Sequence, residues 1–317
     1  MITVLAGGVG AARFLQGLVK EVPPQDLTII VNTGDDLELF GLHISPDIDI
    51  VLYHLAGLAD EARGWGIAGD TFQTVEALAR FGYPTWFRLG DRDLATCIHR
   101  SNLLSEGSTL SEATAHLARA FDIQARILPM SNEYVPTKVE TEDGLIDFQR
   151  FMVERGAKDH VRRIHFHGIH DAQPAPGVLN AIAEANAVVI APSNPLVSIG
   201  PILAVSGVVD ALKEARARIA AVSPIVGGAA IKGPAANMLR DLGYEASAAI
   251  IAKLYADFLD VLVIDNVDAA LAPEIRALRL LAGRQGLDVV ITDTIMKTVE
   301  VKVALARTVL AALDIRP

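Results

Sequence analysis

Four aspartates near the N-terminus form the strongest chemical signal in the sequence. Asp35 and Asp36 close one turn and Asp47 and Asp49 lie in a second, so that all four fall within fifteen positions. Carboxylates on such turns can hold a hard divalent cation, and Mg²⁺ usually takes one or two carboxylates together with phosphate oxygens of a substrate. The alternative is that Asp35 or Asp36 caps the following turn and that Asp47 ends a loop. We expect at least one of the four to contact a metal ion or a substrate.

A glycine-rich turn precedes the first helical pattern. It consists of Gly7, Gly8, Val9 and Gly10. Glycines allow the backbone to approach a ligand closely, and the free amides at the start of a helix favour an anion. The turn lacks the third glycine of a dinucleotide fingerprint and the lysine of a P-loop, so both a phosphate contact and a purely structural turn stay open. Arg13, one turn into the helix, would add positive charge to a phosphate or be a solvated helix residue.

Charged residues surround Gly90. The segment from Arg88 to Asp93 mixes both signs of charge, and Arg100 follows it. Such a mixture is typical of a salt-bridged surface turn. The functional alternative is that Arg88, Arg92 or Arg100 orients an anionic or polar substrate through its fork of donors.

The histidines and the single cysteine do not form a metal-binding pattern. His165 and His167 would share one face of a strand, and His170 follows, but no acidic or cysteine partner has the spacing of a zinc site. We therefore expect structural or surface roles for them. Nothing around Cys97 would activate a thiolate, so a nucleophilic role is not expected.

The candidate site residues lie among apolar segments that alternate with helical segments along the chain. Strands are predicted at residues 2–6, 27–31, 187–191, 219–222, 261–264 and 289–291, and helices at 11–20, 199–214, 246–259 and 296–313. This alternation predicts an α/β fold with a doubly wound, mostly parallel Rossmann-like sheet. Ligands bind at the carboxyl ends of the strands in such a sheet. Six polar or glycine-rich loops follow the predicted strands and indicate a large crevice, at residues 7–10, 32–36, 192–195, 223–228, 265–266 and 292–294.

The middle of the chain has a different pattern. Residues of about 65–165 contain predicted helices at 71–81 and 110–121, followed by short strands near 125–128 and 138–142. We interpret this stretch as an inserted, smaller lobe of helical or mixed structure. The stretches of about 1–64 and 166–317 would form the nucleotide-binding α/β core of the same single unit.

The composition describes a soluble globular protein. Of 317 residues, 51% are hydrophobic and 21% are charged, and the formal net charge is −10. The negative charge argues against a protein that coats nucleic acid through phosphate contacts. One cysteine excludes an intramolecular disulfide framework. The N-terminus lacks the basic segment of a secretory signal, and no apolar run reaches the ~18 residues of a membrane span, so we expect a cytoplasmic protein without a membrane partner.

Several short strings resemble, in order and spacing, those of the 2-phospho-L-lactate transferase family, which includes phosphoenolpyruvate transferases. The resemblance runs over nearly the whole chain. The strings that carry it are Gly7-Gly8-Val9-Gly10 with Ala12-Arg13, Asn32-Thr33-Gly34-Asp35-Asp36, Ser45-Pro46-Asp47-Ile48-Asp49, Trp65-Gly66-Ile67, Leu89-Gly90-Asp91-Arg92-Asp93-Leu94-Ala95-Thr96, Leu128-Pro129-Met130-Ser131, Ala191-Pro192-Ser193-Asn194-Pro195, Ser198-Ile199-Gly200-Pro201 and Ser223-Pro224-Ile225.

The resemblance implies a transferase of coenzyme F-420 biosynthesis with Mg²⁺ as its cofactor. In this family a guanosine-diphosphate-activated hydroxy acid, lactyl or enolpyruvyl, donates its phospho-acid group to the terminal ribityl hydroxyl of the deazaflavin Fo, and GMP leaves. The resemblance also implies a homodimer that acts on small molecules and not on nucleic acid. Which three-carbon acid is transferred stays open.

The resemblance assigns residues by position. Asp49 and Arg88 match the residues that bind Fo, although the family often has lysine in place of Arg88, which changes the donor geometry. Asp49 is the expected catalytic residue, because it could orient the hydroxyl or accept its proton. The metal region matches Asp35, Asp36 and Asp49. The residues that match the nucleotide- and phosphate-binding loops are Gly7, Gly8, Val9, Gly10, Arg13, Ser193, Asn194, Pro195, Ser223 and Pro224.

Two other functions remain open from the sequence. A non-catalytic nucleotide-sugar-binding regulator, resembling the gluconeogenesis factor family, would share a related fold and a glycine-rich start. Trp65-Gly66-Ile67 and Gly90-Asp91-Arg92-Asp93 fit the transferase better. A dinucleotide-dependent oxidoreductase is disfavoured by the missing third glycine, although its second strand would also end in acids.

Overall fold

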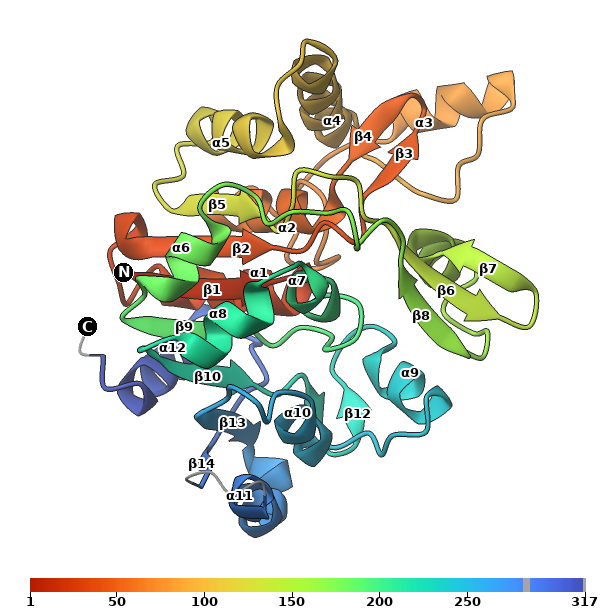
Figure 1. Cartoon of the computed structure of the whole chain (residues 1–317). Coiled ribbons are helices and arrows are strands. Elements are labelled where there is room, and N and C mark those ends of the chain that lie inside the picture. The colour runs from red at the N-terminus through yellow and green to blue at the C-terminus, as the bar shows by residue number, and fades with distance from the viewer. Residues whose placement is uncertain (282–285, 316–317) are drawn as a thin grey trace.

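A parallel sheet of seven strands forms the centre of the molecule (Figure 1). The computed structural model describes residues 1–281 and 286–315. Within these residues the strand order is β14-β13-β10-β9-β1-β2-β5, and each neighbouring pair is parallel. The strands are β1 (Ile2–Ala6), β2 (Leu27–Val31), β5 (Arg126–Pro129), β9 (Ala187–Ile190), β10 (Arg218–Val222), β13 (Val261–Asp265) and β14 (Asp288–Thr292). Chain order runs outward in both directions from the β1–β9 pair, so the sheet is doubly wound and has its switch point there.

Helices cover both faces of the sheet, which explains why its strands are apolar throughout. Successive residues of β1 alternate between two cores: Val4 and Ala6 pack on one face, whereas Leu5 packs on the other. The first face is covered by α1 (Gly8–Leu18), α2 (Pro46–Leu55), α5 (Leu110–Ala120) and α12 (Val299–Ala312). The second face, toward the viewer in Figure 1, is covered by α6 (Val178–Ala183), α7 (Gly200–Ala204), α8 (Val208–Glu214), α10 (Ala248–Leu254) and α11 (Ala272–Leu281).

Two groups of elements project from the carboxyl side of the sheet (Figure 1). One group contains the hairpin of β3 (Leu37–Leu39) and β4 (Leu42–Ile44) with α3 (Gln73–Leu78) and α4 (Asp91–Ser105). The other is an antiparallel sheet of β6 (Thr137–Thr141), β7 (Gly144–Asp147) and β8 (Arg163–Phe166). Smaller elements are β11 (Ile225–Val226), β12 (Ala229–Ala230), α9 (Ala235–Asp241), the 3₁₀ turns Pro24–Asp26, Ala79–Phe81 and Asn266–Leu271, and a π-helical turn at Arg150–Glu154.

The structure confirms the predicted doubly wound α/β fold and corrects several details. The predicted helix at 199–214 is two helices, because Val205 is extended and Gly207 has a φ of 81°, a backbone conformation that a continuing helix does not allow. The predicted helix at 246–259 ends at Leu254. The stretch of about 65–165 is not wholly separate from the core sheet, because β5 within it pairs with β2. Parts of the stretch before and after β5 project from the sheet, whereas α5 packs on its first face.

The helices are short compared with a bilayer. Among the described residues, none combines the length and the apolar character that a membrane-spanning helix requires. Helix α4 has 15 residues, which corresponds to about 22 Å at 1.5 Å per residue, less than the ~30 Å of a hydrocarbon core.

The packing of α1 against α12 depends on Gly17. A Cβ atom at this position would lie 2.2 Å from the carbonyl oxygen of Lys302. We predict that Gly17→Ala lowers the free energy of unfolding by about 1–3 kcal/mol in urea titrations, although alanine is the better helix former. The control Ala304→Gly, at an exposed position of α12, should cost only about 1 kcal/mol. A Gly17→Ala variant as stable as the wild type would contradict the close approach.

Candidate active site

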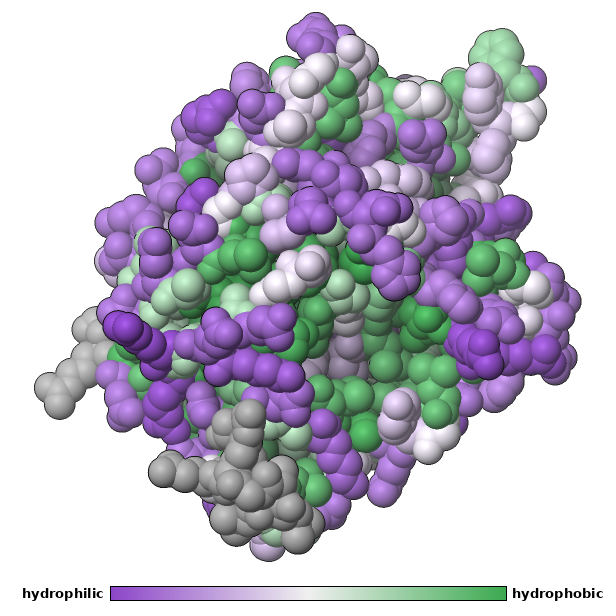
Figure 2. Space-filling view, in the orientation of Figure 1, coloured by the Kyte–Doolittle hydropathy of each residue, from purple (hydrophilic) through white to green (hydrophobic). Residues whose placement is uncertain are grey.

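One cavity of about 470 Å³ lies at the carboxyl ends of the central strands. Its walls include the loops that follow β1, β2, β9, β10 and β14, as the polar loops in the sequence predicted. The loop after β13 is not in the wall. Residues 148–153 and 231–235 also contribute. On the face shown in Figure 2, the surface is hollowed and hydrophobic between the β6–β8 sheet and α9. The cavity therefore opens at the switch point of the sheet.

The first wall is the N-terminus of α1. The first residues of α1 line the cavity, and α1 begins directly after Gly7, which has no side chain to cap it. A Cβ atom on Gly10 would lie 2.1 Å from the carbonyl oxygen of Pro192, so only glycine allows the loops after β1 and β9 to meet. The Gly7 amide donates to Ser193 Oγ at 3.4 Å. Arg13 also lines the cavity and donates to the carbonyl oxygen of Glu61 at 3.1 Å.

Two carboxylates, Asp35 and Asp47, converge on the amide of Asn32. Asn32 Nδ2 lies 3.2 Å from Asp35 Oδ1 and 2.9 Å from Asp47 Oδ2. Both acids are buried and line the cavity. Burial raises the pKa of Asp35 well above its ordinary value, and the neighbouring Asp47 raises it further. Burial likewise raises the pKa of Asp47 to about 6, against the hydrogen bonds from Asn32 and the Gly8 amide.

Asp36, the neighbour of Asp35, points away from the cavity. Its Oδ2 atom accepts from Ser45 Oγ at 2.8 Å and lies 2.8 Å from His43 Nε2. Asp36 is not among the residues that line the cavity. These contacts tie the β3–β4 hairpin to the start of α2, where Ser45 is the N-cap residue and Pro46 the first helical residue.

Asp49 forms a buried ion pair with Arg100. The Arg100 side chain is fully buried, its Nη2 atom contacts Asp49 Oδ1, and its Nη1 atom lies 3.2 Å from Asp49 Oδ2. Burial raises the pKa of Asp49, whereas the Arg100 guanidinium opposes that rise. Asp49 belongs to the first turn of α2 and lines the cavity, whereas Arg100 lies behind it and does not.

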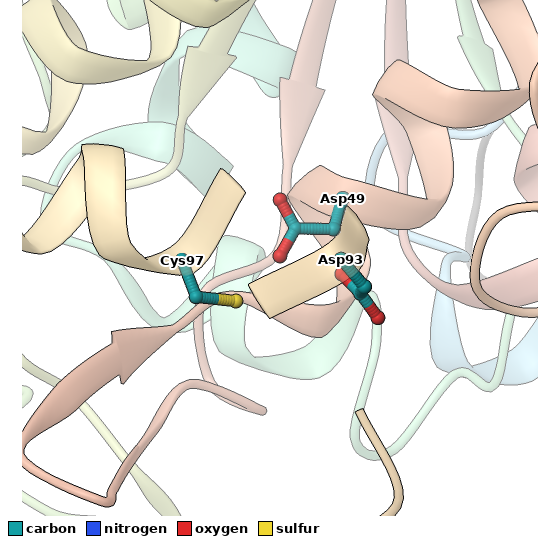
Figure 3. A group of neighbouring side chains, drawn as sticks. All are labelled: Asp49, Asp93 and Cys97. Atoms are coloured by element: carbon teal, nitrogen blue, oxygen red, sulfur yellow. The ribbon is translucent and has the colours of Figure 1, made fainter. Parts of the chain in front are cut away.

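Asp93 is a second acid beside this pair. Figure 3 shows Asp49 on α2 and Asp93 and Cys97 on α4, with the Cys97 sulfur directed toward the two carboxylates. Tyr53 Oη donates to Asp93 Oδ1 at 2.7 Å, and both residues line the cavity. Burial and the nearby Asp49 raise the pKa of Asp93 to about 7. Asp93 therefore exchanges its proton near neutral pH at the cavity wall.

Reciprocal caps join the starts of α3 and α4. Asp70 accepts hydrogen bonds from the amides of Arg92 and Asp93 at the start of α4. Asp91, in turn, accepts from the amides of Gln73 and Thr74 at the start of α3. Each aspartate satisfies backbone donors that a helix N-terminus leaves free. The charged segment around Gly90 is thus a junction between two helices.

Aromatic rings and Arg88 form another part of the cavity wall. Trp65, Trp86 and Phe87 line it together with Arg88. The Arg88 guanidinium lies 4.2 Å from the centre of the Phe72 ring, and its side chain is 55% exposed. A flat, apolar ligand with polar edges would fit this part of the cavity, because the rings offer stacking faces and the exposed Arg88 guanidinium, 3.6 Å from Glu76, offers hydrogen-bond donors.

Most of the predicted site residues meet at this cavity. The lining includes Gly7, Gly8, Val9, Gly10, Arg13, Asp35, Asp49, Arg88, Ser193, Asn194 and Pro224. Asp36, Pro195 and Ser223 are outside it. Ser223 Oγ instead bonds within its own turn, to the Ile225 backbone.

The sequence did not indicate several residues of the site. Asn32 and Asp93 belong to sequence strings that carry the family resemblance, but the sequence did not indicate what their side chains do. Arg100 was considered as an anion-binding residue and is instead buried against Asp49. Gln149 and Lys232 come from segments without any motif, and only the folded chain brings them to the cavity.

Comparison with known proteins identifies the family. The family described as 2-phospho-L-lactate transferase CofD matches residues 2–309. The chain belongs to this family. A 2-phospho-L-lactate transferase of Methanothermobacter thermautotrophicus is 43% identical over 98% of this chain and 97% of its own length. A phosphoenolpyruvate transferase of Streptomyces griseus is 46% identical over 87% of this chain and 89% of its own.

A solved structure shares the fold at lower sequence similarity. A member of the UPF0052 family from Bacillus halodurans superposes with a TM-score of 0.64 and 18% identity, over 98% of both chains. This likeness concerns the fold alone. Membership of the CofD family makes the protein an enzyme of the 2-phospho-L-lactate or phosphoenolpyruvate transferase kind, in preference to the regulator and the oxidoreductase.

The raised pKa of Asp93 predicts a pH-dependent stability. The folded chain holds a proton on Asp93 up to a pH of about 7, whereas the unfolded chain releases it near 4. The stabilising contribution of the protonated form is present below pH 4 and is lost as the pH rises through 7. We predict that Asp93→Asn is more stable than the wild type at pH 8, on the order of a few kcal/mol, and that the difference vanishes near pH 4.

Asp91, on the same helical turn, provides the matched control. Hydrogen bonds from Thr71 and Thr74 lower its pKa to about 2. Asp91→Asn should therefore be less stable than the wild type at pH 8, and the gap should close as the pH falls toward 2. Thermal unfolding between pH 2 and pH 8 measures both variants. If both variants are more stable than the wild type at pH 8, or both are less stable, the environments assigned to Asp93 and Asp91 are contradicted.

Proposed function

We propose that the protein transfers a phospho-hydroxyacid group from a guanosine-diphosphate-activated form to the ribityl hydroxyl of the deazaflavin Fo. GMP is released, and the reaction belongs to coenzyme F-420 biosynthesis. The transferred group is 2-phospho-L-lactyl or enolpyruvyl phosphate. The observation that carries the proposal is a cavity whose walls combine a helix N-terminus and buried acids with aromatic rings and Arg88.

The end near α1 suits the activated acid. The amides of Val9 and Gly10 lie in the first turn of an 11-residue helix, whose partial positive charge favours a phosphate. Arg13 and Lys232 add two cationic side chains to the same wall. Ser193, Asn194 and Pro224 would flank the nucleoside, because they belong to the loops that follow β9 and β10.

The acids near α1 fit a bound Mg²⁺. Asp35 and Asp47 are two close, buried carboxylates whose raised pKa values indicate that positive charge near them is insufficient. The proposed ligands are therefore Asp35 and Asp47, since Asp36 is engaged by His43 and Ser45, and Asp49 by Arg100. When bound, Mg²⁺ would neutralise charge on the diphosphate and polarise its oxygens.

The end with Asp49 and Arg88 suits the acceptor. The rings of Trp65, Trp86 and Phe87 would cover the flat deazaflavin, and Arg88 would bind its polar edge. Asp49 would accept a hydrogen bond from the ribityl hydroxyl. The hydroxyl oxygen then bonds to the phosphorus that carries the acid, and its proton passes to Asp49. The P–O bond to GMP breaks, and its electron pair leaves with GMP.

We further propose a homodimer that works in the cytoplasm. The dimer rests on the resemblance of the sequence to the family, and the cytoplasmic location on the N-terminus and the short apolar runs of the sequence. Light scattering of the purified protein gives the mass in solution and tests the first.

We predict that the purified chain converts Fo to a phosphodiester product in the presence of Mg²⁺ and either activated acid. Mass spectrometry detects the product and GMP, and parallel reactions with the lactyl and enolpyruvyl donors show which acid is preferred. Asp49→Asn should lower kcat about 100-fold or more while GDP affinity stays within about twofold. Absence of product with both donors would contradict the proposed function.

The magnesium proposal makes a separate prediction. Asp35→Asn and Asp47→Asn should each weaken Mg²⁺ binding in the presence of GDP by about tenfold or more, measured by calorimetry. The matched control is Asp36→Asn, which changes a buried acid outside the cavity and should leave Mg²⁺ affinity unchanged. A larger loss of Mg²⁺ affinity with Asp36→Asn than with Asp35→Asn and Asp47→Asn would contradict the proposed ligands.

A further inference from the structure

Arg100 is a buried charge that the proposed chemistry leaves unexplained. It is fully buried, lies on α4, and does not line the cavity, but its guanidinium contacts both oxygens of Asp49. We propose that Arg100 is a positioning residue that holds the Asp49 carboxylate in one orientation, toward the hydroxyl of the acceptor. The inference rests on the proposed function and adds a residue to it.

The geometry of the contact supports this role. Two guanidinium nitrogens bind two carboxylate oxygens, and such a fork fixes the plane of the carboxylate as well as its position. A carboxylate offers about four acceptor sites, so Asp49 keeps lone pairs that Arg100 does not occupy. Asp49 lines the cavity, so these lone pairs can serve the substrate. Lysine would supply the charge without the fork.

The surroundings of Asp49 show why a fixed cation is needed there. Asp36 and Asp93 lie close enough to raise the pKa values of this cluster, and both carry the same sign of charge as Asp49. The other groups that face the pair are His43, Tyr53 and Cys97, and none of them is a permanent cation. An additional metal ion among Asp49, Asp93 and Cys97 would stand beside the Arg100 charge, so the structure favours the arginine as the counterion.

A purely structural role is the alternative. The pair joins α2 to α4, and a buried ion pair adds little net stability compared with a well-packed apolar pair. A structural role predicts that the loss of Arg100 lowers stability and lowers activity equally, with or without Asp49. A positioning role predicts that Arg100 acts only through Asp49. The two roles differ in how the effects of the variants combine.

A double-mutant cycle on the full-length protein separates them. The variants are Arg100→Met, Asp49→Asn and the double variant, and steady-state turnover of Fo with the activated acid gives kcat and KM for each. We expect Arg100→Met to lower kcat about 100-fold with GDP affinity unchanged. The double variant should match Asp49→Asn within about twofold. Arg100→Lys should recover part of the loss, since it restores charge without the fork.

One comparison within the cycle and one further variant keep the test decisive. If Arg100→Met fails to fold because it leaves Asp49 unpaired, the comparison of Asp49→Asn with the double variant still applies, since the double variant removes both charges and Asp49→Asn keeps an amide oxygen that can accept from Arg100. Lys302→Met is the control: it removes another buried cation, which binds Gln16 and Glu61 outside the cavity wall, and should lower the melting temperature with kcat within about twofold of wild type.

The outcomes distinguish the two levels of the proposal. If the wild-type chain is active and the losses of kcat in the two single variants multiply in the double variant, the positioning role is overturned. The proposed function then stays intact. No product from the wild-type chain would overturn the proposed function, and the role of Arg100 would fall with it.

Discussion

The cost of burying negative charge constrains the whole carboxyl side of the sheet. Asp35, Asp36, Asp47, Asp49 and Asp93 are each less than 10% exposed, and they lie in or beside one cavity wall. An isolated carboxylate inside a protein costs far more free energy than one hydrogen bond returns, so each acid must find a cation, a set of donors or a proton. The structure supplies all three, each to a different acid.

The group that balances the negative charge differs from one aspartate to the next, and this difference indicates a different role for each. Asp36 is held by the β3–β4 hairpin and serves the scaffold. Asp49 has the permanent cation of Arg100 and stays fixed, while Asp93 keeps a proton to near neutral pH. The pair that converges on Asn32 has only donors, and it is the pair that faces the N-terminus of α1. A magnesium nucleotide brings the missing positive charge to that end, whereas the acceptor alcohol meets the fixed carboxylate.

The sequence was informative where a local pattern decides the structure. β1 and β2 were predicted with their observed bounds, because strands buried on both faces are continuous apolar runs. The sequence did not predict contacts between segments that are far apart in the chain. Periodicity does not encode the order of strands in a sheet, so β5 was assigned to the lobe although it pairs with β2. Asp49 and Arg100 are 51 positions apart on different helices, and no pattern of residue types links them.

The central claim is that a diphosphate and a cation occupy the α1 end of the cavity. The most direct measurement is a crystal structure of the protein with GDP and Mn²⁺, in which anomalous scattering locates the metal. The account predicts an anomalous peak between the diphosphate and the carboxylates of Asp35 and Asp47, with phosphate oxygens at the Val9 and Gly10 amides. A diphosphate bound away from α1, or a metal ion bound elsewhere in the chain, would contradict it.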